Sequence, residues 1–220
     1  MKPIRVYCAN LPQRKERREH IEKEFKNRPE FFLRLVPAIE HKTNGAEGLY
    51  QTFLSILDME RDCNTPYFIF IEDDHKFTAT YSFSYLEKSI AVADTMGAEI
   101  LVGGPTFIHI PLQCTPNLFW VKVFNGCQFM VVFRKVFTKY QEVVENKRRI
   151  LDVSLSEIFD YTFVMYPTIS EQEFFGYSDA TPELFKNTDS YLRGLSLQVE
   201  RRMQILDQLR EVVTKSISIV

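Results

Sequence analysis

The feature that most constrains this fold is a run of apolar residues that stops at three acids. Residues 67–71 (YFIFI) are apolar without interruption, and Glu72, Asp73 and Asp74 follow directly. A strand that is apolar at every position is covered on both faces, as in a parallel sheet with helices on each side. Ligands of open α/β folds bind beyond the carboxyl ends of such strands. We therefore expect the three acids to lie at a ligand site.

Adjacent carboxylates repel one another, so these acids need a cation or full contact with water. Mg²⁺ and Mn²⁺ prefer oxygen ligands, and they commonly combine one or two carboxylates with substrate phosphates. We predict a divalent metal site in which Glu72 and Asp74 are ligands. The alternative is an exposed acidic turn.

Predicted strands and helices alternate along the first half of the chain. This order favours an α/β fold with a mostly parallel central sheet flanked by helices. Beyond residue 102, the apolar runs 118–124 and 128–133 predict two strands paired through a tight turn at Asn125, Gly126 and Cys127. Hydrophobic spacing predicts strands at 4–9, 32–39, 67–71, 99–102 and 162–166, and helices at 16–27, 46–61, 83–96, 135–147 and 154–159.

The C-terminal segment shows a different pattern, with residues repeating at spacings of three and four. Arg202 interrupts an otherwise apolar series formed by Leu192, Leu195, Val199, Leu206, Leu209 and Val213. We expect a domain at 1–187 and a helical extension at 188–220. Such a short series fits an amphipathic helix packed on its own domain, and the alternative is a homodimer formed through residues 192–213.

Composition excludes several classes of protein. The chain has 220 residues, enough for one domain, and Lys and Arg total 27 against 29 Asp and Glu, so no overall positive charge attracts nucleic acid. Its four cysteines form no CxxC pair, which argues against a zinc site or a disulfide framework. With no predicted signal peptide or membrane span, we expect a cytoplasmic protein, with attachment to the inner face of a membrane as an alternative.

A second candidate site lies near the N-terminus. Asn10 leaves the first predicted strand, and Arg14 and Arg17 open the following helix. Helix starts and arginine side chains both suit phosphate oxygens. We expect Arg14 and Arg17 to contact a phosphate or nucleotide, and the alternative is a solvated helix face.

In their order, these motifs resemble the family-25 glycosyltransferases, which include lipopolysaccharide-biosynthesis galactosyltransferases and collagen galactosyltransferase domains. Glu72, Asp73 and Asp74 match the family's Glu-Asp-Asp, and Thr52 and Phe53 stand where the family has a Ser-His pair. The remaining similar positions are Asn10, Leu11, Arg17, Gly45, Glu47, Gly48, Gly126 to Val132, Asp152, Tyr166, Pro167, Gln172, Ser178 and Asp179.

The resemblance implies a GT-A-type fold, a UDP-sugar donor (commonly UDP-galactose), Mn²⁺ or Mg²⁺, and inversion at the anomeric carbon. The acceptor would be a saccharide or glycolipid, such as lipopolysaccharide or another surface glycan. Asp152 is the first candidate for the base that deprotonates the acceptor, and Glu171, Glu173 and Asp179 are substitutes. Capping of the following helix is the alternative role of Asp152. The expected nucleotide-sugar-binding residues are Asn10, Leu11, Arg14, Arg17, Glu47, Gly48, Asp73 and Gln172.

Two other functions remain open at this point. A nucleotidyltransferase would use a similar metal site, but it should carry a glycine-rich phosphate loop after the first strand, where this chain has Asn10, Leu11 and Pro12. A catalytically degenerate transferase domain, kept for binding or assembly, is favoured by Phe53, which cannot titrate or hydrogen-bond through its side chain.

Overall fold

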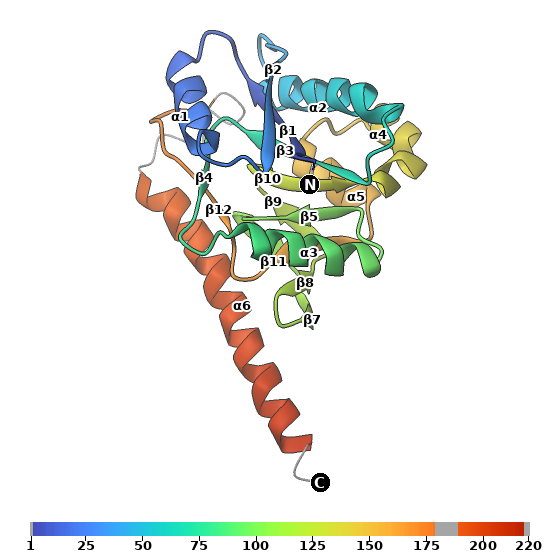
Figure 1. Ribbon diagram of the computed structural model, residues 1–220, viewed down its shortest axis with the longest axis vertical. Helices are drawn as coiled ribbons and strands as arrows, with labels where there is room; N and C mark the ends of the chain where they lie inside the picture. Colours follow the sequence, from blue (N-terminus) through green and yellow to red (C-terminus); the bar gives the residue numbers. More distant parts are fainter. Residues whose placement is uncertain (1, 179–188, 218–220) are drawn as a thin grey trace.

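The acid-terminated strand lies inside an eight-stranded sheet in the computed structural model (Figure 1). The structure describes residues 2–178 and 189–217. In spatial order the strands of this sheet are β2 (Phe31–Pro37), β1 (Ile4–Asn10), β3 (Tyr67–Glu72), β10 (Phe129–Phe133), β5 (Ile100–Val102), β11 (Thr162–Met165), β8 (Leu118–Trp120) and β7 (Leu112–Thr115). Two short ribbons pair β4 (His75–Phe77) with β12 (Ser170–Gln172), and β6 (Phe107–His109) with β9 (Val123–Asn125).

Helices cover both faces of the large sheet, as the apolar strand predicts. The helices are α1 (Lys15–Phe25), α2 (Gly45–Arg61), α3 (Phe83–Thr95), the 3-10 turn η1 (Arg134–Lys139), α4 (Tyr140–Glu145), α5 (Leu151–Ile158) and α6 (Asp189–Ile217). Phe68 and Phe70 of β3 belong to the core on the side of α2 and α5. Ile69 and Ile71 belong to the core on the side of α1 and α3. The predicted α/β class, with its flanking helices, is confirmed.

Most strands of the sheet share one direction. β1 pairs in parallel with both β2 and β3, and β5 pairs in parallel with β11. β10 and β8 run against the other strands, and β10 is inserted between β3 and β5. The carboxyl ends of β1, β2 and β3 therefore meet at one edge of the sheet, directly beside the acids.

The predicted pairing of 118–124 with 128–133 is wrong. β10 pairs with β3 and β5, whereas β9 pairs with β6 and β8 pairs with β11 and β7. The physical reason is burial, because every residue of β10 is buried and a strand apolar on both faces belongs in the middle of the sheet. The turn at Asn125 and Gly126 thus joins two different sheets.

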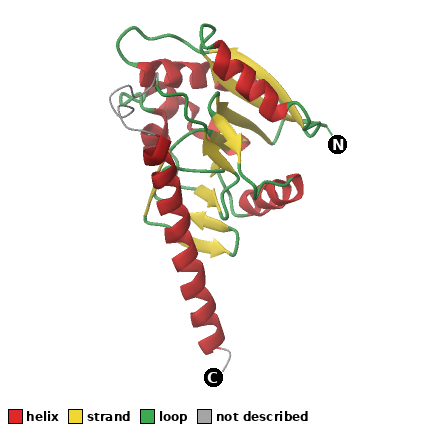
Figure 2. Ribbon diagram, turned by 90° about the vertical axis from the view of Figure 1, so that its left-hand side faces the viewer, coloured by secondary structure: helices red, strands yellow, loops and turns green. Residues whose placement is uncertain are grey.

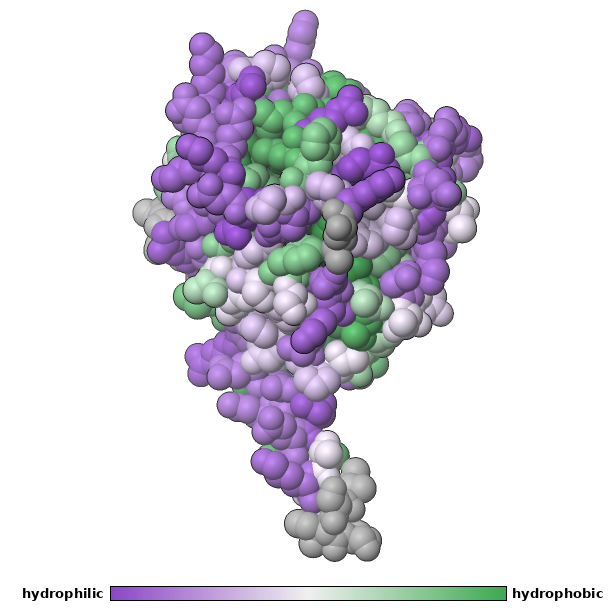
Figure 3. Space-filling model, viewed as in Figure 1, coloured by the Kyte–Doolittle hydropathy of each residue, from purple (hydrophilic) through white to green (hydrophobic). Residues whose placement is uncertain are grey.

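The long helix α6 runs along the body and projects beyond it (Figures 1 and 2). Its first half packs on the domain, since Val199 and Met203 are buried in the core and Leu206 packs against it. Leu209 and Val213 are exposed, and the projecting part is mostly hydrophilic on the face shown in Figure 3. The packed alternative thus holds for the first half of the helix, and the homodimer stays a prediction.

The predicted boundary at residue 187 lies outside the described residues, so the division into two domains stays a prediction. Asp179, one of the substitutes for the base, also lies outside them. Within 2–178 and 189–217, no helix combines the length and the hydropathy needed to cross a bilayer.

Candidate functional site

The three acids follow directly from β3 into a turn that begins a second ribbon. Glu72 is the last residue of β3, and Asp73 and Asp74 lead at once into β4. The backbone N–H of Glu173, just after β12, donates to the carbonyl oxygen of Asp74 at 2.7 Å. This contact fixes the turn, so the acids are held between two sheets and not on a free loop. Asp73 and Asp74 are each only 8% exposed.

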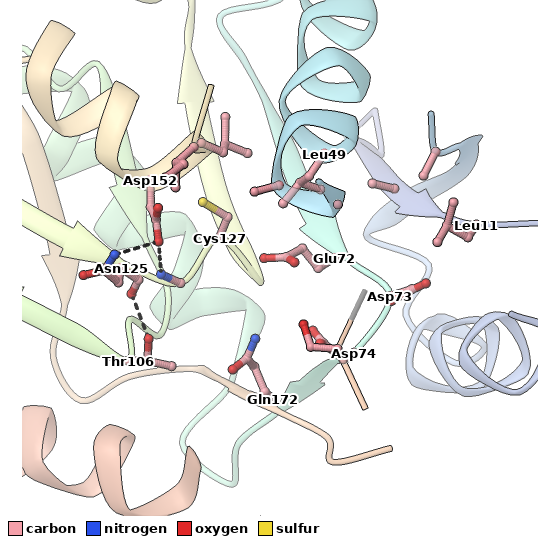
Figure 4. A pocket seen from close by; sticks show the side chains of 18 of the residues that line it. Leu11, Leu49, Glu72, Asp73, Asp74, Thr106, Asn125, Cys127, Asp152 and Gln172 are labelled. Carbon is pink, nitrogen blue, oxygen red and sulfur yellow. Dashed lines mark hydrogen bonds between the residues drawn. The ribbon is translucent and has the colours of Figure 1, made fainter. Parts of the chain in front are cut away.

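A cavity of about 610 Å³ opens beside this turn. It lies at the carboxyl ends of β1 and β3 and at the beginnings of α2 and α5, which is the position expected for a ligand site in an α/β fold. Figure 4 shows the side chains of Glu72, Asp74, Gln172 and Asp152 around the cavity, from three segments far apart in the sequence. The predicted site residues that line it are Leu11, Arg17, Glu72, Asp73, Asp74, Asp152 and Gln172.

Arg17 supplies the main positive charge next to the acids. Its Nη1 atom lies 2.8 Å from Asp73 Oδ1 and 3.3 Å from Asp74 Oδ2, and its Nη2 atom donates to the carbonyl oxygen of Tyr177 at 2.9 Å. The guanidinium also faces the rings of Phe175 and Tyr177, with its Cζ atom at 4.9 and 4.8 Å from their centres. Arg17 is therefore fixed in one place at the edge of the cavity.

Asp73 differs from its neighbours because its carboxylate is turned toward β1 and α1. Asn10 Nδ2 donates to Asp73 Oδ2 at 2.8 Å, while Arg17 takes the other oxygen. Asn10 therefore supports the site through Asp73, and it is absent from the lining among the described residues. Both oxygens of Asp73 are engaged, and these bonds hold Asn10 and Arg17 at the cavity edge that Asp73 also lines.

The carboxylates that face the cavity carry more negative charge than their surroundings compensate. Burial raises the pKa of Glu72 well above its usual range, and the nearby charges of Asp74, Asp73 and Asp152 raise it further. Burial also raises the pKa of Asp74 to about 6, although Arg17 acts in the opposite direction. A bound cation would favour the ionised forms of both groups.

The residues fit a metal that shares its ligands with a substrate. Asp74 Oδ1 is buried and has no hydrogen-bond partner among the described residues, and the Glu72 side chain points into the same space. Within the described part of the chain, no group of three His, Cys, Asp or Glu side chains could hold an ion alone. Two carboxylates completed by phosphate and water oxygens suit Mg²⁺ or Mn²⁺, whereas structural zinc needs a closed set of four protein ligands.

Asp152 lies across the cavity from Asp74, in the first turn of α5. Its Oδ2 atom accepts from Asn125 Nδ2 and from the backbone N–H of Gly126, both at 3.0 Å. Ile150 occupies the N-cap position of α5, but Asp152 Oδ1 accepts from the backbone N–H of Val153 at 2.8 Å, so the side chain does satisfy a donor of the first helical turn, as the capping alternative expects. The carboxylate also joins α5 to the turn after β9, and its assignment as the base stays a prediction.

Three further predicted contact residues are absent from the lining among the described residues. Arg14 stacks on the ring of Tyr177, with its Cζ atom 4.2 Å from the ring centre. Glu47 accepts from Gln51 Nε2 at 2.8 Å. Gly48 sits so close to the strand exit that an added Cβ would lie 2.2 Å from the Ile39 carbonyl oxygen, so its role is close packing of α2.

Phe53, which stands where the similar family has a histidine, also lies away from the cavity. It is 1% exposed and packs edge-on against Phe70, with ring centres 5.3 Å apart. Its neighbour Thr52 accepts from the Ile39 N–H and donates to the Gly48 carbonyl oxygen. Both residues hold α2 against the sheet, and neither belongs to the described lining of the cavity.

Sequence reasoning missed several residues that line the cavity. Thr106 and Phe107 lie at the beginning of β6, while Asn125 and Cys127 flank Gly126 in the turn after β9. Tyr191, from the first turns of α6, closes another side. An Asn-Gly pair at a strand end is a visible turn signal, but nothing local shows that this turn faces the acids.

Comparison with known proteins gives partial structural likenesses. No protein-family model and no curated protein matches the sequence. A glycosyltransferase involved in the glycosylation of the major capsid of PBCV-1 superposes with a TM-score of 0.49 and 12% identity, over 84% of this chain and 99% of that chain. An apo UDP-glucose pyrophosphorylase gives a TM-score of 0.47 and 8% identity, over 90% of this chain and 82% of that chain. Both TM-scores are below 0.5, so neither likeness assigns a function to this chain.

Proposed function

We propose that this chain is a metal-dependent inverting glycosyltransferase similar to family 25, with a GT-A-type fold. It would move a hexose, with galactose favoured, from a UDP-sugar to a saccharide or glycolipid acceptor. The observation that carries the proposal is the pair of carboxylates, Glu72 and Asp74, directed into one cavity at the carboxyl edge of the sheet beside Arg17. A surface turn would not keep Asp74 only 8% exposed with an unpartnered oxygen.

The charges of the cavity fit a metal-bound diphosphate. Glu72 and Asp74 Oδ1 would hold the ion, and Arg17 stands beside them to bind phosphate oxygens. When bound, the metal would neutralise the charge that develops on the departing diphosphate. The volume of about 610 Å³ falls within the usual range for small-molecule sites.

The two ends of the cavity suit the two parts of a nucleotide sugar. Apolar and backbone groups at Ala38, Ile39 and Leu49, near the ends of β1 and β2, offer a surface for the nucleoside. Asn125, Asp152 and Gln172 gather polar groups on the far side of the acids, where sugar hydroxyls would find partners. In this arrangement Asp152 would accept the proton of the attacking hydroxyl.

The test is turnover of UDP-galactose and UDP-glucose, measured as release of UDP in the presence of Mn²⁺ and stopped by EDTA. Asp74→Asn should lower the rate by about 100-fold or more, because a site that stabilises developing charge contributes several kcal/mol. Asp94→Asn, on the exposed face of α3, is the matched control and should retain the wild-type rate.

Three outcomes separate the candidate functions. Mn²⁺-dependent release of UDP supports a glycosyltransferase, and the configuration of the transferred sugar, read by NMR, tests inversion. Binding of UDP without turnover on any donor and acceptor would instead favour the degenerate binding module. Formation of a UDP-sugar from UTP and a sugar phosphate would favour a nucleotidyltransferase.

A further inference from the structure

A second cavity, of about 400 Å³, lies between the β4–β12 ribbon and α6. We call it the α6 groove and define it by residues from three segments. These residues are Thr78 and Thr80, which follow β4; residues 167, 168 and 170–172, in and before β12; and Arg193, Ser196, Leu197 and Glu200 of α6. Figure 1 shows β4, β12 and α6 side by side at this place. The volume is again within the range of small-molecule sites.

The floor of the α6 groove is held by hydrogen bonds and not by loose packing. The backbone N–H of Thr168 donates to Glu200 Oε1 at 2.6 Å, and its hydroxyl reaches the same oxygen. Thr78 Oγ1 donates to the Thr168 carbonyl oxygen at 2.8 Å. These bonds fix α6 against the ribbon, so the groove has walls of defined shape before any ligand binds.

The chemistry of the lining favours an uncharged ligand with many hydroxyl groups. The lining holds Arg193 against Glu171 and Glu200, and Lys76 Nζ lies 3.4 Å from Glu171 and 2.9 Å from Glu173, so the walls carry a small net negative charge. Hydroxyl, amide and carboxylate groups from Ser196, Gln172 and Glu171 can donate to and accept from sugar hydroxyls. A phosphorylated ligand would meet the carboxylates of Glu171 and Glu200, and the apolar side chains of Pro167 and Leu197 offer contact to the C–H face of a sugar ring.

The α6 groove adjoins the donor cavity. Gln172 lines both spaces, and it pairs in register with His75, next to Asp74. Helix α6 lines both cavities, because Leu195 lines the donor cavity while Ser196 and Leu197 line the groove. A molecule that extends from the groove past Gln172 would therefore approach the acids that would hold the metal.

We infer that the α6 groove binds the acceptor, and that it takes the second and third sugar units of an oligosaccharide whose reactive unit lies at Gln172. This inference rests on the proposed function. It gives the chain a preference for oligosaccharide over monosaccharide acceptors, which the donor cavity alone would not supply. It also gives the packed half of α6 a role in binding substrate.

The inference is tested by filling the groove. Ser196→Phe places a ring in it, and Arg193→Ala removes one polar wall without adding bulk. Gln198→Phe, at an exposed position of the same helix outside the groove, is the matched control. Binding of lactose and maltotriose, with galactose and glucose for comparison, is followed by ligand-observed NMR in the presence of UDP and Mn²⁺.

We expect the wild-type protein to bind lactose or maltotriose more tightly than either monosaccharide. Ser196→Phe should weaken this binding about tenfold or more and Arg193→Ala about threefold, while Gln198→Phe stays within about twofold. Equal binding by wild type and Ser196→Phe would overturn the inference. So would the lack of binding of either oligosaccharide by a wild-type protein that UDP and Mn²⁺ stabilise against heat.

Thermal stabilisation by UDP and Mn²⁺, measured on all four proteins, separates the two proposals. Stabilisation that is equal in wild type and Ser196→Phe shows that the variant is folded and that the donor cavity is intact. Loss of oligosaccharide binding in Ser196→Phe, without any effect of UDP on the wild type, would support the groove and contradict the proposed donor.

Discussion

Two clusters of hydrogen-bonded side chains, each around buried carboxylates, lie near opposite ends of β1 and are built in different ways. Near the beginning of β1, Glu60 is 1% exposed, and its carboxylate accepts from Arg5 Nη2 and Thr65 Oγ1, both at 3.0 Å, and from the Tyr7 hydroxyl. Near the end of β1, Asp74 Oδ1 has no partner among the described residues. Burial with saturated hydrogen bonds indicates a structural group, whereas burial without them indicates a group kept for a ligand.

The difference extends to the pKa of neighbouring groups. Burial and the Glu60 carboxylate raise the pKa of Tyr7 to about 12, so this hydroxyl remains a donor at every physiological pH. In the cavity, by contrast, burial and mutual repulsion raise the pKa values of the acids themselves. The Glu60 cluster therefore contributes to stability, and the cavity acids reduce it in the absence of a cation.

Among these substitutions, Glu60→Ala should lower the stability of the folded protein the most. It leaves the buried Tyr7 hydroxyl without its acceptor and the partly exposed Arg5 without its ion pair, and leaving such donors unpaired should lower the free energy of unfolding by about 3 kcal/mol. Urea denaturation measures this loss. Release of UDP from a UDP-sugar, expressed per folded molecule, should be unchanged, and a selective loss of activity would show that the two clusters are not separate.

Glu72→Gln should act in the opposite direction on stability. The amide removes one of the mutually repelling charges, so we expect the metal-free protein to unfold at a higher temperature. Turnover with Mn²⁺ should fall by about 100-fold, equivalent to about 2.7 kcal/mol. A variant that is both less stable and fully active would place Glu72 with the structural acids.

The pH dependence of stability should change with the metal. The pKa of Asp74 in the folded state, about 6, lies above its ordinary value in an unfolded chain, so the folded state binds more protons. In EDTA, stability should therefore fall as the pH rises from about 4 to about 6, and Glu72 acts in the same direction. With saturating Mn²⁺ this fall should be much smaller, and calorimetric scans at several pH values compare the two conditions.

Among these substitutions, Tyr177→Leu should cause the smallest change, a modest loss of affinity for UDP. It removes the ring that faces Arg14 and Arg17, while Arg17 keeps its ion pairs with Asp73 and Asp74. Cation–π contacts of this kind contribute about 0.5–2 kcal/mol. We expect the affinity for UDP to fall by about threefold to tenfold by titration calorimetry, and an unchanged affinity would show that the ion pairs alone position Arg17.

The position of the cavity acids could be predicted from the sequence, because it depends on a local pattern of residues. The run at 67–71 predicts a strand covered on both faces, and the acids at its end line a cavity as expected. The opposite orientations of Asp73 and Asp74 could not be predicted, because they depend on Asn10 and Arg17, more than fifty residues away in the chain.

Strand pairing between distant parts of the chain also explains why the predicted pairing of residues 118–124 with 128–133 is wrong. The runs 118–124 and 128–133 are separated by a turn signal, so a local hairpin is the natural prediction. The partners of β10 are β3 and β5, and no residue within the turn encodes them. For the same reason, Asn125 and Gly126 were visible as a turn but not as the support of Asp152.

The central claim is that Glu72 and Asp74 form an incomplete metal site that a nucleotide diphosphate completes. Titration of Mn²⁺, followed by electron paramagnetic resonance with and without UDP, tests it most directly. We predict weak binding of Mn²⁺ alone, at least tenfold tighter binding with UDP, loss of both in Asp74→Asn, and wild-type binding in Asp94→Asn. Binding of Mn²⁺ that is unaffected by Asp74→Asn, or a UDP affinity that is independent of Mn²⁺, would contradict the claim.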